Sequence, residues 1–252
     1  MPRDAIRIRD LELDCTIGVN PDERDREQRL IVAAELALDL TRAGTHGHIS
    51  DTCDYARVAG EIAALLAFRR YRLLESAAHE VAAMLLAVHP QIEGVRLQLD
   101  KPEALRGRLR KYSARAARPD RSAPGPFGAG VIAGVTVERR AADFPRRFEA
   151  ASYGSVEVVL ETQEAGLYLL HLRPGGAIAP HHHGVMQELE WPVRGELVRG
   201  GVKVSGFDPR VWPQGQAHDY VNAGSTTATL FCCDQPRFMR SDEIHLEASK
   251  QG

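Results

Sequence analysis

The spacing of apolar residues changes between the two halves of the chain, and this change limits the folds that the chain can adopt. In the first half, apolar residues occupy every second position over 30–40 and again over 95–99, which predicts two strands with one buried side each. Between them, apolar residues recur at helical spacing in 58–66 and 74–88, which predicts two helices. One strand precedes this pattern and another, at 131–140, closes it. Together these elements predict an antiparallel α+β unit.

From about residue 141 onward, the signals are those of short strands only. The segments VEVVLE, GLYLLHL, ELEWPV and TTATLFCC are apolar runs separated by glycine and proline, which predicts a sandwich or barrel. We therefore expect an α+β domain over 1–140 and an all-β domain over 141–252. The segment 106–130 is basic at first and then rich in Pro, Gly and Ala, which predicts an insertion loop or linker. Its arginines would alternatively suit a local phosphate-binding patch.

Composition narrows the classes of function. The formal net charge of −2 excludes overall electrostatic capture of nucleic acid or of an anionic membrane, so neither is an expected partner. No apolar run reaches the roughly 18 residues of a membrane-spanning helix. The first ten residues, MPRDAIRIRD, contain no apolar signal core. Four cysteines without a Cys-x-x-Cys pair fit a reducing compartment, and we expect a cytoplasmic protein.

Three consecutive histidines stand out in the second half, within GGAIAPHHHGVMQELEWPVRGEL at 175–197. Side chains alternate between the two faces of a strand, so His181 and His183 share one face and His182 points to the other. Glu188 follows across a short turn, and His218 comes after a Pro-x-Gly turn in a separate segment. Three imidazoles and a carboxylate suit one divalent transition metal, namely Zn, Fe, Mn, Ni or Cu. A histidine-rich surface turn is the alternative for the first segment alone.

The spacing of these residues resembles the two motifs of the cupin family, over about 150–240. Gly175, His181, His183, Glu188 and Gly195 resemble the first motif, and the segment from Pro213 through His218 to Asn222 resembles the second. The resemblance implies a small β-barrel with a metal held by His181, His183, Glu188 and His218. Glu190 is the competing carboxylate, because it lies on the same face of its strand. Cupin chemistry is diverse, so the resemblance indicates a fold and a metal but no reaction.

Four polar residues in the first half occupy positions that each have an ordinary structural explanation. These residues are Glu23, which we expect in a loop between two strands, and Tyr55, Glu75 and Lys101. Taken together with their surroundings, they resemble the dihydroneopterin aldolase family over about 4–105 and 131–140. The pieces that carry the resemblance are IGV followed by Glu23, DTCDY at 51–55, LLE at 73–75, DKPEAL at 100–105 and GVTVERR at 134–140. The insertion at 106–130 departs from the family pattern.

The resemblance implies a tunnelling fold, in which several subunits form a shared barrel and active sites lie at subunit interfaces. A homo-oligomer, either a tetramer or an octamer, is therefore expected. The implied substrate is 7,8-dihydroneopterin on the folate route. The implied roles are pterin binding by Glu75 and the backbone of Leu74, proton transfer by Lys101 and Tyr55, and binding of the hydroxylated side chain by Glu23. Neither a metal nor a Schiff base is needed in this half.

Three other interpretations remain open at this point. The first half also resembles the related epimerase that acts on dihydroneopterin or its triphosphate, and the arginines of 106–121 would suit a triphosphate. Alternatively, the cupin is the active metal enzyme and the first half only assembles it. A metal or ligand sensor without catalysis is a third role for the cupin. If both halves are active, the chain is bifunctional.

Overall fold

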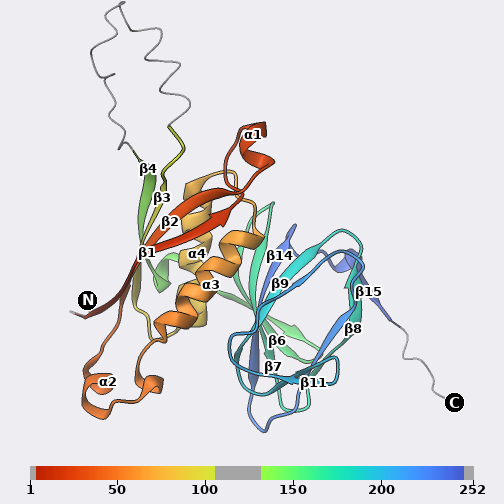
Figure 1. The fold of residues 1–252 in the computed structure, drawn as a ribbon. Coiled ribbons are helices and arrows are strands. Elements are labelled where there is room, and N and C mark those ends of the chain that lie inside the picture. Colours follow the sequence, from red (N-terminus) through yellow and green to blue (C-terminus); the bar gives the residue numbers. More distant parts are fainter. Residues whose placement is uncertain (1–3, 106–131, 247–252) are drawn as a thin grey trace, which may run out of the picture.

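The computed structural model describes residues 4–105 and 132–246. The expected insertion loop at 106–130, with its alternative role in phosphate binding, lies outside the described residues. Figure 1 shows two units packed side by side, one of mixed helices and strands and one of strands. Among the described residues, no helix is both long enough and apolar enough to cross a membrane.

The first unit is a four-stranded antiparallel sheet with two helices on one face. Its strands lie in the order β1-β2-β3-β4, with bounds β1 Ala5–Cys15, β2 Gln28–Ala37, β3 Gly94–Lys101 and β4 Ala133–Arg140. The two helices are α3 Tyr55–Phe68 and α4 Leu74–Val88, and short helices α1 Pro21–Arg24, α2 Thr41–His46 and η1 Ile49–Asp51 occupy the connections. Asp54 caps α3 by accepting hydrogen bonds from the backbone N–H groups of Ala56 and Arg57.

The second unit consists of two antiparallel sheets. One has the order β11-β10-β13-β8-β15 and the other the order β12-β9-β14-β7-β6-β5. The strands are β5 Arg147–Ala151, β6 Gly154–Glu161, β7 Gly166–Leu172, β8 Ala177–His183, β9 Gln187–Arg194, β10 Leu197–Arg199, β11 Val202–Val204, β12 Arg210–Trp212, β13 His218–Asn222, β14 Ala228–Gln235 and β15 Glu243–His245. The short helices η2 Ala141–Asp143 and η3 Arg240–Asp242 precede β5 and β15.

This architecture confirms the expected fold class, an α+β unit followed by an all-β barrel, and two local expectations need correction. The alternation over 30–40 does not continue as strand to its end, because β2 ends at Ala37. Beyond it, the Asp39 carboxylate accepts the backbone N–H of Thr41 at 2.8 Å and helix α2 begins. Glu23 lies in the short helix α1 rather than in a loop.

Helix α4 lies between the sheet of the first unit and the strands of the second, as Figure 1 shows. Eleven of its fifteen residues are buried. A helix buried to this extent must be covered by other elements on more than one side. One hydrophobic cluster runs from β2 and α4 into the barrel, where it includes Leu169, Trp191 and Phe231. The expected domain boundary between residues 140 and 141 remains a prediction, because the hydrophobic core is continuous between the two units.

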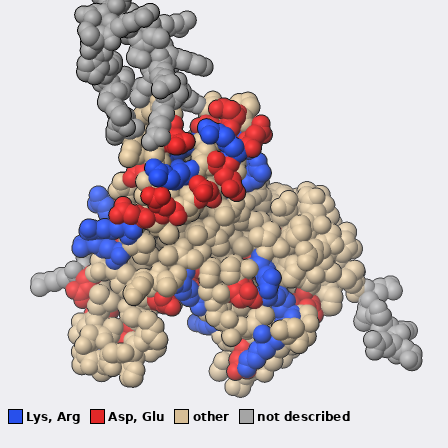
Figure 2. Space-filling view, viewed as in Figure 1, with Lys and Arg blue, Asp and Glu red and all other residues tan. Residues whose placement is uncertain are grey.

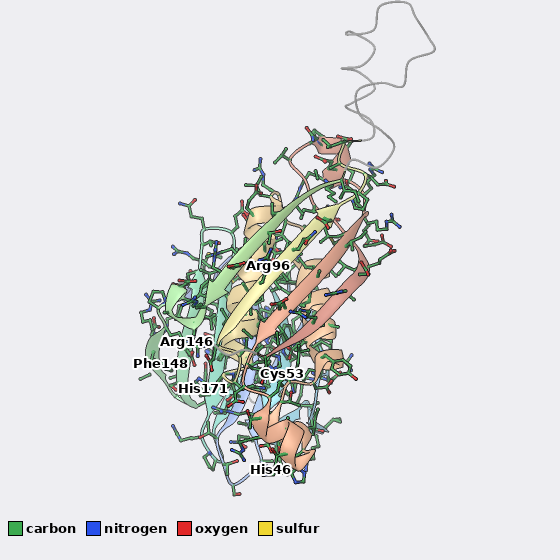
Figure 3. All side chains as sticks on the ribbon, turned by 90° about the vertical axis from the view of Figure 1, so that its left-hand side faces the viewer. His46, Cys53, Arg96, Arg146, Phe148 and His171 are labelled. Carbon is green, nitrogen blue, oxygen red and sulfur yellow. The ribbon has the colours of Figure 1, made fainter. Side chains whose placement is uncertain are left out.

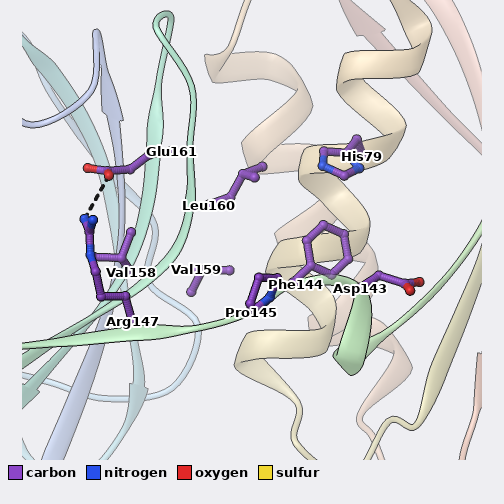
Figure 4. Close-up of a pocket in the computed structure, with 9 residues that line it drawn as sticks. All are labelled: His79, Asp143, Phe144, Pro145, Arg147, Val158, Val159, Leu160 and Glu161. Carbon is purple, nitrogen blue, oxygen red and sulfur yellow. Dashed lines mark hydrogen bonds and ion pairs between the residues drawn. The ribbon is translucent and has the colours of Figure 1, made fainter.

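Polar contacts also join the two units. Arg57 of α3 donates to the carbonyl oxygen of Pro192 at 3.0 Å, and Arg146 donates to that of Leu86 at 2.7 Å. Gly60 of α3 is needed for close approach, because a Cβ atom there would lie 2.6 Å from the Phe207 ring. A pocket of about 240 Å³ lies at the same junction, and Figure 4 shows the His79 and Phe144 rings that meet beside it.

Candidate active site and candidate metal centre

Lys101, the last residue of β3, is buried and forms an ion pair with the half-buried Glu23 of α1. Its Nζ donates to Glu23 Oε1 at 2.7 Å and to the Ile17 carbonyl oxygen at 2.7 Å. Burial by itself raises the pKa of the Glu23 carboxyl, but hydrogen bonds from Lys101 and Asn20 lower it to about 2. Glu23 is therefore ionised at neutral pH. Gly18, at φ +148°, leaves the space that this carboxylate fills, because a Cβ there would lie 2.5 Å from Glu23 Cδ.

The start of α4 lies at the same end of the unit as this ion pair. The Tyr71 carbonyl oxygen, shortly before the helix, accepts from the backbone N–H of Gly18 at 3.0 Å and from Arg24 at 2.9 Å. Leu74 and Glu75 occupy the first turn of α4, and Glu75 is exposed. The structure thus brings three of the four expected polar residues, Glu23, Lys101 and Glu75, to one end. Figure 2 shows acidic and basic side chains gathered over this end, around α1.

Tyr55 lies at the opposite end of the unit. It is the first residue of α3, and its side chain is 65% exposed. Gln91, just beyond the far end of α4, donates to the Thr52 carbonyl oxygen at 3.3 Å and so places the start of α3 beside the end of α4. Fifteen helical residues span about 20 Å. Within one chain, Tyr55 is therefore not brought to Lys101.

The expected metal ligands lie together inside the barrel. His181 and His183 come from β8, Glu188 from β9 and His218 from β13, and β8 and β13 are neighbours with His218 opposite His181. All four are buried, and one ligand atom from each lies within 4.8 Å of the others. His182 points to the other face of β8, opposite Ile244 on β15.

The orientation of these side chains fits a metal. His183 Nε2, His218 Nε2 and Glu188 Oε2 are buried and make no hydrogen bond of standard geometry within the described structure, although His218 Nε2 lies 2.9 Å from Glu188 Oε2. His181 Nδ1 lies 2.8 Å from the Ala179 carbonyl oxygen, and His218 Nδ1 lies 3.3 Å from that of Gln216. When Nδ1 carries the proton and donates it to a carbonyl, Nε2 keeps its lone pair for a metal.

The two glutamates of β9 have different surroundings. Burial raises the pKa of the Glu188 carboxyl, but the neighbouring His183 and His218 lower it below its ordinary value overall. Burial and the charge of Glu188 raise the pKa of Glu190, whose Oε2 accepts a hydrogen bond from Trp212 Nε1 at 2.6 Å. Glu188, rather than Glu190, therefore offers an ionised carboxylate to the three histidines.

The sequence did not predict three polar residues that lie near the candidate metal centre. Cys232 and Asp234 of β14 form a second group with Glu188, and the Cys232 thiol donates to Asp234 Oδ1 at 2.8 Å. Asp242 accepts from the backbone N–H groups of residues 184–186, the turn that joins β8 to β9. The apolar run around Cys232 gives no signal for such a role, and Asp242 acts through a contact between distant segments.

Comparison with known proteins finds likeness in both units. A family model described as dihydroneopterin aldolase matches residues 6–115. A dihydroneopterin aldolase of Methylorubrum extorquens is 34% identical over 101 residues, which cover 40% of this chain and 78% of that protein. The solved structure of Escherichia coli dihydroneopterin aldolase in complex with neopterin is 32% identical, covers 54% of this chain and 98% of that chain, and has a TM-score of 0.42. A Klebsiella pneumoniae protein with a double-stranded β-helix domain is 27% identical, covers 31% of this chain and 69% of that chain, and has a TM-score of 0.29.

Proposed function

Because the chain belongs to the dihydroneopterin aldolase family through its first unit, we propose that this unit is a lyase that cleaves 7,8-dihydroneopterin. The products are 6-hydroxymethyl-7,8-dihydropterin and glycolaldehyde, as in folate-type pterin biosynthesis. The observation that carries the proposal is the ion pair between the half-buried Glu23 and the buried Lys101, at the same end of the unit as the exposed Glu75. This arrangement offers a proton carrier and a carboxylate for the pterin side by side.

The chemistry needs proton transfer and an electron sink. A base removes the proton from the side-chain hydroxyl next to the bond that breaks. That carbon–carbon bond then cleaves to release glycolaldehyde, and its electron pair passes into the pterin ring. The carbon left on the ring takes up a proton, so the step balances without a metal or a redox partner. Lys101 carries these protons directly or through water, and Glu23 binds the hydroxylated side chain.

Glu75 and Tyr55 complete the site in different ways. The Glu75 carboxylate accepts hydrogen bonds from the flat N–H edge of the pterin, beside the backbone of Leu74. Within its own chain, Tyr55 lies about 20 Å from the end of the first unit that holds Lys101. It therefore serves in proton transfer at the site of a neighbouring subunit. The active site then lies between subunits of a homo-oligomer, either a tetramer or an octamer.

The buried cluster in the barrel favours a second function beside the first. We propose that His181, His183, Glu188 and His218 hold one divalent transition metal, whether Zn, Fe, Mn, Ni or Cu. The three imidazoles and the carboxylate would hold the ion, which would supply Lewis-acid chemistry to a small ligand. The barrel would then be a metal enzyme or a metal-dependent sensor.

The full-length chain tests the aldolase proposal when product formation is followed before and after metal is stripped with a chelator. We expect cleavage to survive chelation. Lys101→Ala should lower kcat by about 10²–10⁴-fold, as removal of a proton-transfer group does. Glu75→Ala should weaken pterin binding by about 1.5–3 kcal/mol, whereas Glu93→Ala, at an exposed glutamate beyond the other end of α4, should change neither value.

Product analysis separates the alternatives in the same assay. Glycolaldehyde indicates cleavage, and an isomer of the substrate indicates epimerisation. If chelation abolishes turnover, or if Lys101→Ala turns over at the wild-type rate, then the aldolase assignment is wrong and the barrel is the active enzyme.

A further inference from the structure

A groove of about 410 Å³ lies between the two units. One wall comes from the start of α3 and the end of α4, and the other from β6, β7, β9 and β14. In Figure 3, Arg146, Phe148 and His171 lie close to one another on the barrel side of this junction. We call it the interdomain groove and define it by six lining side chains, Arg57, Arg146, Glu157, His171, Arg194 and Thr229. Its volume is in the range of small-molecule sites.

A chain of contacts orders the barrel side of the interdomain groove. Arg194 Nε donates to Thr229 Oγ1 at 3.0 Å, and this hydroxyl lies 3.1 Å from His171 Nδ1. His171 Nε2 lies 3.0 Å from Glu157 Oε2, and Arg146 donates to Glu157 Oε1 at 2.7 Å. Every group finds a partner when the Thr229 hydroxyl donates to His171 and His171 donates to Glu157.

This chain of contacts fixes the Arg194 side chain by one N–H group only. Two residues that anchor this chain of contacts, Thr229 and Glu157, are 1% and 4% exposed. Phe148 stacks on the His171 ring, with the ring centroids 6.4 Å apart and an angle of 22° between the ring planes. Within residues 4–105 and 132–246, no hydrogen bond engages the two terminal amino groups of Arg194, which are left for another partner. A guanidinium oriented in this way is prepared to bind an oxyanion through two parallel hydrogen bonds.

Arg194 differs from the other two arginines of the interdomain groove, because Arg57 pairs with Glu61 and Arg146 pairs with Glu157. Both Glu157 oxygens are already bound by Arg146 and His171, and the carboxylate of Asp54, at the groove edge, caps α3. Across the described residues, no carboxylate lies within ion-pair distance of Arg194. Arg57 reaches the groove from the opposite wall, where its Nε donates to Glu61 Oε1 at 2.8 Å and its Nη2 donates to the carbonyl oxygen of Pro192, two residues from Arg194. A bound anion would supply the charge partner that Arg194 lacks within the described residues.

We propose that the interdomain groove binds a small molecule with an oxyanion group, either a phosphate or a carboxylate, through Arg194 and Arg57. The inference does not depend on the aldolase proposal, because it uses none of the residues assigned to that site. Thr229, His171, Glu157 and Arg146 act as positioning residues that hold Arg194 in the binding orientation.

Calorimetric titration of the full-length chain tests this site, with inorganic phosphate and succinate as separate probes at low ionic strength. The His181→Ala/His218→Ala background removes binding of either probe to a metal in the barrel. We expect at least one probe to bind, and Arg194→Gln to weaken that binding at least about tenfold, as loss of a charge-assisted hydrogen bond does. Arg173→Gln removes the same charge from an exposed position of the barrel outside the groove and should leave the Kd unchanged.

A second variant, Thr229→Val, keeps the side-chain volume but removes the hydroxyl that orders Arg194, and it should also weaken binding. Preference for phosphate or for succinate identifies the class of anion. The proposal is overturned if neither probe binds at up to about 20 mM, twentyfold above a Kd of about 1 mM. Equal affinity in wild type and Arg194→Gln, or an equal loss in Arg173→Gln, overturns it as well.

Discussion

His89, just beyond the end of α4, illustrates how a single buried residue links stability to pH. Its Nε2 lies 2.5 Å from Glu61 Oε2, and both side chains are buried. Burial by itself lowers the pKa of His89, but hydrogen bonds with Cys53 and Glu61 raise it to about 9, above the ordinary value of 6.5. The charged imidazole is therefore favoured in the folded chain relative to the unfolded chain.

This shift predicts a loss of stability at alkaline pH. A raised pKa contributes stability that is fully present below the unfolded value of about 6.5 and is lost as pH rises through about 9. The contribution is at most about 3 kcal/mol. Urea unfolding at pH 6 and pH 9 should show a larger decrease in the free energy of unfolding for wild type than for His89→Gln. Identical decreases in the two proteins would contradict the role of His89.

The metal ligands show which single residues are predictable from sequence and which are not. Strand alternation determines that His181 and His183 share a face, and the short turn after them returns Glu188 to the same space. The contact between Cys232 and Asp234 is not predictable in this way. Both residues lie at the end of an apolar run on a central strand, and the run gives no sign that their side chains point toward the metal ligands. The separation of Tyr55 from Lys101 also depends on tertiary structure, since only the packing of α3 against α4 determines it.

At the scale of elements, β8, β9 and β13 bring together the candidate metal ligands, and this arrangement predicts the metal content of variants. We expect one divalent metal per chain in the wild type, and His181→Ala should lower retention markedly because it removes a ligand. His182→Ala is the matched control, since that side chain points to the opposite face. Elemental analysis after dialysis measures both. Equal metal content in the wild type and in the His181→Ala/His218→Ala double variant would rule out this centre.

The limits of prediction differ among elements. The long elements follow from periodicity, because a buried face repeats several times within each. The three-residue strands β12 and β15 are too short to show any period, and pairing with β9 and β8 creates them. The end of β2 at Ala37 has a different, local origin. The apolar alternation continues beyond it, but the Asp39 turn diverts the backbone.

For the whole molecule, the sheet of the first unit predicts assembly. In the described chain β1 and β4 are its edge strands, and open edges of this length are suited to pairing with another copy. Tyr55 and Glu75 also lie at opposite ends of the first unit, so the proposed aldolase site would need residues from two chains. We expect light scattering to give the mass of a tetramer or an octamer at working concentration. A monodisperse monomer that cleaves dihydroneopterin at full rate would refute this arrangement.

The burial of α4 between sheet and barrel has a consequence for the history of the chain. The barrel covers the side of α4 that would otherwise face water. Removal of either unit would therefore expose apolar surface on the other. Loss of the barrel would expose apolar residues of α4, and loss of the first unit would expose the part of the shared hydrophobic core that lies in the barrel. The two units are therefore inherited as one stable piece, and unfolding of one unit by a protease would destabilise the other.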